Sequence, residues 1–317
     1  SFFGDEQDCV TVKAGVTQNY PDADVFFAQG CPTADPGTKV LGFQKTPPKE
    51  EFDLQEALDT AVELAKKADK VVLTLGEHRD FSGEGASRAD ITLPSCQLEL
   101  FHKICEVNPN VCVVLFNGRP LDIREINQKA KAILEAWLPG TEGGNALAAI
   151  LYGDASPSGR LSMSFPYCVG QVPVHYNHMS TGRPFAGDYR TTRYNSKYLD
   201  IPNEPLYPFG YGLTYTAFEY SDISLDSDIL HKGDSICASV RVTNTGERPG
   251  TETVQMYLHD VSASVTRPVR ELKGFCKVFL EPGESRVVAF PITEDMLRFY
   301  NITMNSVRAP RHIEVFI

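Results

Sequence analysis

The stretch from residue 71 to residue 97, VVLTLGEHRDFSGEGASRADITLPSCQ, constrains the fold more than any other part of the chain. It opens on an apolar, mostly β-branched run at residues 71–75, which has the length of one buried strand. A charged loop with two glycines follows, and a helix is predicted after Pro94. Buried parallel strands bind ligands beyond their carboxyl ends, so the loop that follows this strand is the first candidate for a functional site.

Strand and helix patterns alternate on both sides of this loop. Asp53 and Glu56 have the spacing of a capping box, and apolar residues then recur at helical period over 54–68. Residues 111–116 and 130–138 predict two further strands, and a helix from about Thr141 is expected to end at Gly153. Repeated units of this kind predict an α/β domain, with a mostly parallel sheet sandwiched by helices. Residues 1 to about 50 are predicted to be irregular, with one edge strand at 25–28.

The last hundred residues change in character. Residues 238–244, 252–259 and 286–291 alternate apolar and polar side chains, and turn sequences such as NTG and EPG separate such runs. This pattern predicts an antiparallel β-sandwich of the immunoglobulin or fibronectin type III kind. We therefore expect an α/β domain at residues 1–181, an ordered, tyrosine-rich linker at 182–214 and the β-sandwich at 215–317.

Composition excludes several classes of function. The 41 acidic and 30 basic residues are spread along the chain without a basic run, which argues against a nucleic-acid partner. No apolar stretch reaches the roughly 20 residues of a membrane helix. The eight cysteines form no C-x-x-C pair, so we expect reduced thiols, with Cys9 and Cys31 the pair to check first. The histidines lack metal-ligand spacing, and neither a metal nor a cofactor is predicted. Scattered cysteines favour a cytoplasmic location.

A series of segments, in order along nearly the whole chain, resembles the C-terminal half of glycoside hydrolase family 3, most closely its bacterial β-glucosidases of the periplasmic type. The segments are SGEGASRADITLP, VLFNGRPLDI, AILEAWLPGTEGGNALAAILYGDASPSGRLSMSFP, HYNHMSTGRP, YPFGYGLTYTAFEYS, VTNTGERPGTETVQMYLHD and RPVRELKGF. The series is more specific than any one of its members.

The resemblance implies an N-terminal (β/α)8 barrel, which these residues do not include, followed by an α/β sandwich and a fibronectin-like domain. It places the nucleophilic aspartate on the barrel and a first strand of the sandwich just before Ser1, so we expect this chain to be part of a longer enzyme and inactive alone. The expected partners are β-linked glucosides or oligosaccharides and that barrel. A homodimer stays open as an alternative to a monomer, and the resemblance implies a periplasmic or secreted location.

Retaining glycosidases need two carboxyl groups, one as nucleophile and one as general acid and base. By resemblance the general acid/base is Glu84, and the flanking Gly83 and Gly85 would let the backbone approach a sugar closely. Glu77 is the rival candidate because it directly follows a predicted strand. A carboxylate in that place more often anchors the loop through an arginine such as Arg88.

Four neighbouring side chains could line a sugar subsite, since a pocket for a sugar needs an aromatic face and charged groups for its hydroxyls. They are His78, Arg79, Asp80 and Phe81. The favoured function is a retaining β-glucosidase to which this chain contributes the acid/base. Two alternatives are a β-xylosidase or arabinosidase of the same family, and a carbohydrate-binding or assembly module without catalysis.

Overall fold

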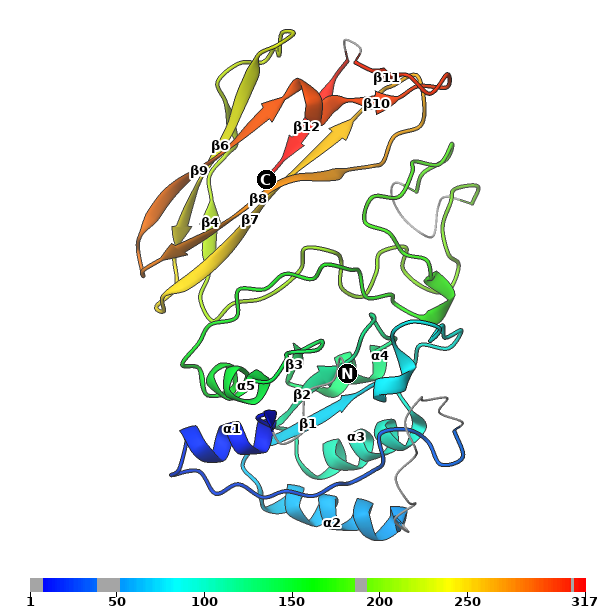
Figure 1. Ribbon diagram of the computed structural model, residues 1–317, viewed down its shortest axis with the longest axis vertical. Helices are drawn as coiled ribbons and strands as arrows, with labels where there is room; N and C mark the ends of the chain where they lie inside the picture. The colour runs from blue at the N-terminus through cyan, green and yellow to red at the C-terminus, as the bar shows by residue number, and fades with distance from the viewer. Residues whose placement is uncertain (1–7, 39–51, 186–192, 309–310) are drawn as a thin grey trace. The chain divides into compact units, whose positions relative to one another are not determined.

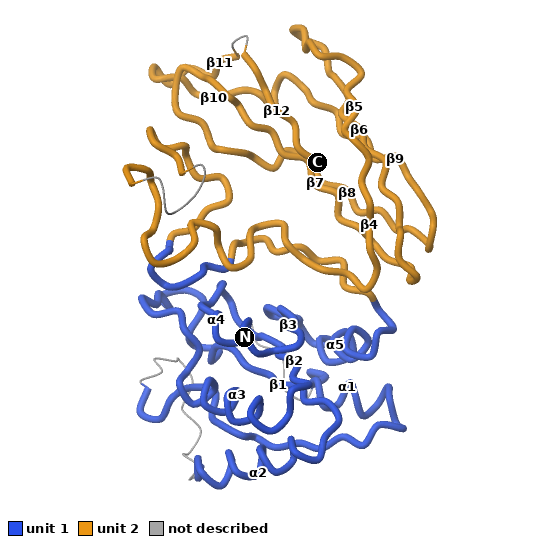
Figure 2. Tube along the Cα trace, turned by 180° about the vertical axis from the view of Figure 1, so that it is seen from behind, with its two compact units in different colours: residues 1–155, 165–172 blue, residues 156–164, 173–317 orange. Residues whose placement is uncertain are grey.

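The computed structural model describes residues 8–38, 52–185, 193–308 and 311–317. The chain forms two compact units, one of residues 1–155 and 165–172 and one of residues 156–164 and 173–317 (Figure 2). Each unit has its own sheets and core. Within the described residues, no helix is long and apolar enough to cross a membrane.

The first unit is built on a parallel sheet of three strands, in the order β1 (Val71–Gly76), β2 (Val111–Phe116) and β3 (Ala132–Glu135) (Figure 1). Val71 lies opposite Val111 and Cys112 opposite Ala132. The central strand supplies the core, because the side chains of Val113, Val114 and Leu115 are fully buried. The predicted α/β class is confirmed.

Helix α2 (Leu54–Lys67) begins, and helix α5 (Gly143–Tyr152) ends, where their capping residues predict. Helix α2 starts after Asp53, whose carboxylate accepts hydrogen bonds of 3.0 Å from the backbone N–H groups of Gln55 and Glu56. Helix α5 ends at Gly153 with φ of 85°. Helices α3 (Ser95–Val107) and α4 (Arg124–Lys129) follow β1 and β2 along the chain. In Figure 1, α2 and α3 lie together on one side of the sheet.

Two predictions for the N-terminal region are wrong. Residues 12–19 form helix α1 (Val12–Asn19), where we expected irregular chain. Its apolar stripe is too short to show in the sequence, and it packs so closely on α5 that a Cβ on Gly15 would lie 2.2 Å from the carbonyl oxygen of Gly144. Residues 25–28 form no strand, and Phe26 and Phe27 are more than half exposed.

The second unit is an antiparallel β-sandwich, as predicted. One sheet pairs β6 (Ser235–Asn244) with β9 (Ser285–Thr293), β4 (Phe218–Tyr220) and β5 (Ser224–Leu225). The other joins β7 (Gly250–Asp260) to β8 (Glu271–Leu280) and β12 (Ile313–Phe316). A short hairpin pairs β10 (Phe299–Tyr300) with β11 (Ser306–Val307). The two sheets share one core, to which β6, β7, β8 and β9 contribute Val240, Met256, Leu280 and Phe290.

Residues 156–164, which fall inside the predicted α/β domain of residues 1–181, belong to this second unit. The backbone N–H of Leu161 donates to the carbonyl oxygen of Tyr211 at 2.8 Å, and the Thr253 hydroxyl donates to that of Ser158 at 2.9 Å. Arg160 forms a 2.6 Å ion pair with Glu252, and both side chains are largely buried.

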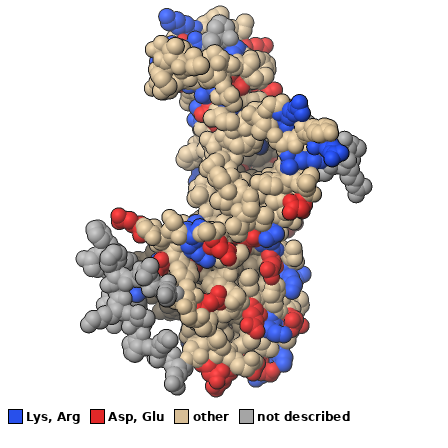
Figure 3. Space-filling view, turned by 90° about the vertical axis from the view of Figure 1, so that its right-hand side faces the viewer, with Lys and Arg blue, Asp and Glu red and all other residues tan. Residues whose placement is uncertain are grey.

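On the face drawn in Figure 3, acidic and basic side chains are interspersed.

Candidate active site

Three consecutive parallel strands end at one edge of the sheet of the first unit. Glu77 directly follows β1, Asn117 directly follows β2 and Glu135 is the last residue of β3. The backbone N–H of Glu77 donates to the carbonyl oxygen of Phe116 at 2.9 Å, which continues the register of the sheet past its last pair. This is the edge at which open α/β sheets bind ligands, so it is the candidate site.

Two contacts fix the chain at this edge. A Cβ on Gly76 would lie 1.9 Å from the carbonyl oxygen of Phe116, and Gly76 has φ of 149°, so no other residue fits there. The buried amide of Gln97 accepts from the backbone N–H of Gly76 at 2.8 Å and donates to its carbonyl oxygen at 3.0 Å. The loop therefore leaves β1 from a rigid base.

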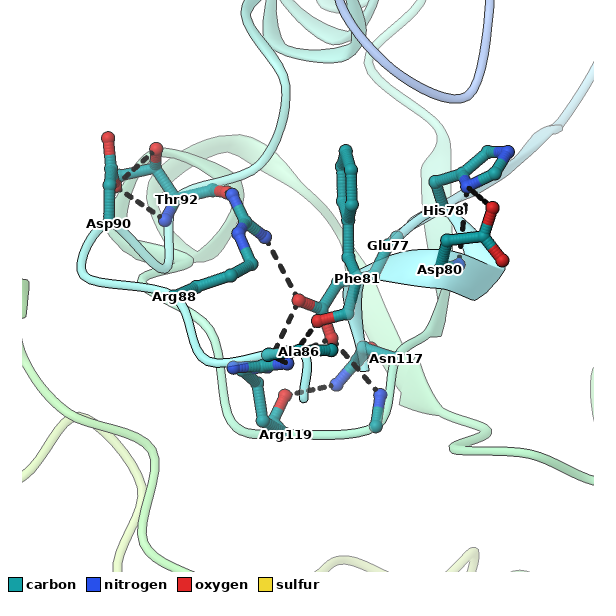
Figure 4. A network of polar contacts seen from close by, with 12 residues as sticks. Glu77, His78, Asp80, Phe81, Ala86, Arg88, Asp90, Thr92, Asn117 and Arg119 are labelled. Carbon is teal, nitrogen blue, oxygen red and sulfur yellow. Dashed lines mark hydrogen bonds and ion pairs between the residues drawn. The ribbon is translucent and has the colours of Figure 1, made fainter. Parts of the chain in front are cut away.

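Glu77 is buried between two arginines. Its side chain is 2% exposed, and its carboxylate lies 2.9 Å from Nη1 of Arg88 and 3.1 Å from Nε of Arg119 (Figure 4). The backbone N–H of Gly118 also donates to it, at 3.3 Å. A carboxylate with this many donors is well suited to hold a loop in place. It is poorly placed to give a proton to a ligand or to take one from it.

Glu84 lies at the tip of the loop. The backbone N–H of Ala86 donates to the carbonyl oxygen of Gly83 at 3.3 Å, so Glu84 and Gly85 are the two central residues of a turn. Gly85 has φ of 72°, and Gly83 has φ of 112°, both in the region that favours glycine. The Glu84 side chain is exposed and makes no ion pair with the described residues. It is available to a molecule that approaches the loop.

The four residues predicted to line a subsite form a small cluster beside this loop. Residues Arg79–Phe81 form one turn of 3-10 helix, capped by His78, whose Nδ1 accepts from the backbone N–H of Asp80 at 3.2 Å. The ring of Phe81 lies between the His78 imidazole, 5.6 Å away, and the Arg88 guanidinium, 4.9 Å away. Arg79 is half-exposed, so its side chain is the most accessible of the four.

Glu135 is a site residue that the sequence analysis did not identify. Burial raises the pKa of its carboxyl to about 7, although it accepts hydrogen bonds from the backbone N–H of Trp137 at 2.9 Å and from Nδ2 of Asn117 at 3.3 Å. Trp137 has a φ of 50°, which is unusual for a bulky residue. The predicted strand ran from 130 to 138, so the sequence placed Glu135 inside a strand, whereas the structure ends β3 at this residue.

The other chemistry-bearing groups are not assembled into a site. Among the described residues, no group of three or more His, Cys, Asp or Glu side chains is placed to hold a metal ion. The structure describes all eight cysteines, and no disulfide joins any of them. Cys9 and Cys31 were the pair to check first for a disulfide, but the thiol of Cys31 shares a hydrogen bond with Cys96. Burial raises the pKa of the Cys31 thiol to about 11.

Two domain models match the chain. The glycosyl hydrolase family 3 C-terminal domain matches residues 5–215, and the fibronectin type III-like domain matches residues 252–317. The chain is 45% identical over 312 residues to the periplasmic beta-glucosidase of Salmonella typhimurium, a match that covers 97% of this chain and 41% of the relative. It is 41% identical over 260 residues to a beta-xylosidase of Formosa agariphila, which covers 81% of this chain and 34% of the relative.

Solved structures are similar over almost the whole chain. The beta-glucosidase from Listeria innocua in complex with glucose has a TM-score of 0.87 and 39% sequence identity, and the match covers 99% of this chain and 41% of that one. The chain thus spans about two-fifths of the length of the relatives it matches. Both domain models, the sheet order and these similarities agree, and the chain belongs to glycoside hydrolase family 3.

Proposed function

We propose that this chain is the C-terminal part of a retaining β-glycosidase and that Glu84 is its general acid and base. The observation that carries the proposal is the position of Glu84 on an exposed, glycine-flanked turn at the ligand-binding edge of the sheet. The carboxylate of the rival, Glu77, is already occupied by Arg88 and Arg119. Glu84 can therefore reach a substrate, whereas Glu77 acts as an anchor.

The reaction needs a second carboxyl group about 5 to 5.5 Å from the first. In the proposed mechanism, an aspartate on an N-terminal barrel attacks the anomeric carbon while Glu84 protonates the leaving oxygen. Glu84 then removes a proton from the water that releases the sugar. Because Glu84 is exposed in this chain, the enclosed site that keeps an acid protonated would form only when the barrel covers the loop.

The proposed substrates are β-glucosides, on the strength of the relatives named beta-glucosidases and of structures solved with glucose and laminaribiose. β-Xylosides are the second class, because one relative is named a beta-xylosidase. In the cluster of residues 78–81, we propose that the half-exposed side chain of Arg79 contacts a sugar hydroxyl.

The test uses the full-length enzyme that contains this chain, with a series of aryl β-glucosides and β-xylosides. The ratio of kcat/KM on the two sugars identifies the substrate class. Glu84→Ala is expected to lower kcat/KM roughly 10²- to 10⁴-fold on substrates with poor leaving groups, and far less on activated aryl glycosides, which barely need a proton. Glu99→Ala, on an exposed face of α3, is the matched control. Equal losses on both kinds of substrate would refute the role of Glu84.

A further inference from the structure

The loop that carries Glu84 has little packing of its own. Gly83, Glu84 and Gly85 are all exposed, and a Cβ on either glycine would meet no heavy atom within 4 Å. Glycines also give the unfolded chain more freedom than other residues. The position of the Glu84 carboxyl therefore depends on contacts made by the residues on either side of the turn.

One arginine, Arg119 in the loop that follows β2, makes those contacts. Nη2 of Arg119 donates hydrogen bonds to the carbonyl oxygen of Phe81 and, at 2.8 Å, to the carbonyl oxygen of Ala86. Phe81 precedes Glu84 and Ala86 follows it, so the same nitrogen closes the loop at both ends (Figure 4). Nε of the same guanidinium lies 3.1 Å from the buried carboxylate of Glu77.

Arg119 is itself held by the end of the sheet. Asn117, which is 1% exposed, donates from Nδ2 to the carbonyl oxygen of Arg119 at 2.8 Å and to Glu135 at 3.3 Å. Gly118 brings the two loops together, because a Cβ there would lie 2.4 Å from the Ser82 hydroxyl. A continuous set of contacts thus runs from β3 through Asn117 and Arg119 to the turn around Glu84.

We propose that Arg119 is a positioning residue that holds the Glu84 turn in the geometry needed for proton transfer. This inference rests on the proposed function for its catalytic consequence. A guanidinium is suited to the task because its nitrogens point in fixed, separate directions, one toward Glu77 and one toward the two carbonyl oxygens. A lysine ammonium is a single point of charge on a flexible stem and cannot keep both sets of contacts.

The structural half of the proposal is tested on this chain by hydrogen exchange. Arg119→Ala is expected to speed the exchange of the Phe81 and Ala86 backbone amides, which donate to the carbonyl oxygens of His78 and Gly83, about tenfold or more, while amides in β2 and α3 stay protected. Arg119→Met and Arg119→Lys serve as second variants if the alanine variant does not fold. Arg124→Ala is the matched control, because Arg124 also pairs with a buried aspartate, Asp122 at 2.8 Å, and does not contact the two carbonyl oxygens. Unchanged exchange in the Arg119 variants would overturn the proposal.

The catalytic half is tested by a double-mutant cycle in the full-length enzyme. Arg119→Lys is expected to lower kcat on substrates with poor leaving groups about 10- to 100-fold and to leave KM nearly unchanged. In the Glu84→Ala background the same substitution should have almost no further effect, because Arg119 acts through Glu84. An equal loss in both backgrounds would overturn the positioning role. If Glu84→Ala alone leaves activity intact, the proposed function fails, and hydrogen exchange still decides whether Arg119 orders the loop.

Discussion

Glu77 and Arg88 form an ion pair of 2.9 Å between the two ends of the loop that carries Glu84. Eleven positions separate them in the sequence, and the buried carboxylate of Glu77 also contacts Arg119 in the loop after β2. The ion pairs of Glu77 thus hold the two ends of the loop together, and the turn with Glu84 lies at its tip. This arrangement separates the structural carboxylate from the one that we propose takes part in catalysis.

Removal of the charge of Glu77 is expected to destabilise the first unit. Glu77→Gln leaves two arginines facing a neutral amide in a largely buried place, which costs about 3 kcal/mol of the free energy of unfolding. Urea unfolding followed by the fluorescence of Trp137, the sole tryptophan of the chain, reports on this unit. Glu99→Gln, an exposed change, should stay within about 0.5 kcal/mol of wild type. Equal stability of the two variants would show that Glu77 is not an anchor.

Gly76 should tolerate no side chain. Gly76→Ala places a methyl group 1.9 Å from the Phe116 carbonyl oxygen on a backbone with φ of 149°, so we expect a loss of roughly 3 kcal/mol or more. Gly170→Ala is the control in the same unit, because its Cβ would make only an ordinary contact of 3.6 Å with Cys168. A fully stable Gly76→Ala variant would contradict the close approach of β1 and β2 at this edge.

Glu135 makes the stability of the first unit depend on pH. Burial raises the pKa of this carboxyl from 4.5 to about 7 in the folded chain, so the folded state holds a proton that the unfolded state releases. The contribution is complete below pH 4.5, falls as the pH rises and is lost above about 7. At about 1.4 kcal/mol per pH unit, wild type should lose on the order of 3 kcal/mol relative to Glu135→Gln over that range.

Urea titrations of both proteins at several pH values between 4 and 8 measure this difference. A difference that does not change with pH would contradict a raised pKa of Glu135 in the folded chain.

Asp35 caps helix α3 from a distant part of the chain. Its carboxylate accepts from the backbone N–H groups of Ser95 at 3.0 Å and Cys96 at 2.9 Å, and Pro94 offers no side-chain cap. Burial opposes its charge, but these hydrogen bonds lower the pKa of Asp35 below its ordinary value. Asp35→Ala should cost about 1 to 2 kcal/mol at pH 7. The loss should shrink as the pH falls through the pKa of Asp35, and a loss independent of pH would argue against a charged cap.

Much of the fold could be predicted from local patterns. Capping residues predict the start of the helix after Asp53 and the end of the helix at Gly153. A continuous apolar run predicts the strand at 111–116. Each of these signals lies within a few neighbouring positions of the sequence. Helix α1 and strand β8 were missed because their burial is set by partners elsewhere in the chain. In β8 the run FCKVF lacks strict alternation, since Phe275 and Phe279 face outward.

The candidate site divides in the same way. Glu84 and Glu77 could be proposed from the loop after β1, but the roles of Arg119, Asn117 and Glu135 depend on three strands ending side by side. Those contacts join positions 33 to 42 residues apart or, for Asn117 and Glu135, 18 residues apart, and no local motif records them. The raised pKa of Glu135 is caused by its burial, which the residues next to it in the sequence do not indicate.

The measurement that tests the central claim most directly is the rescue of Glu84→Ala by azide in the full-length enzyme. Azide is an anion and needs no general base, so it should restore turnover of an activated aryl β-glucoside and yield the β-glucosyl azide, the product expected of a retaining enzyme without its acid/base. Glu77→Gln, once shown to be folded, should give no such product. A glucosyl azide from the Glu77 variant and none from Glu84→Ala would contradict the account.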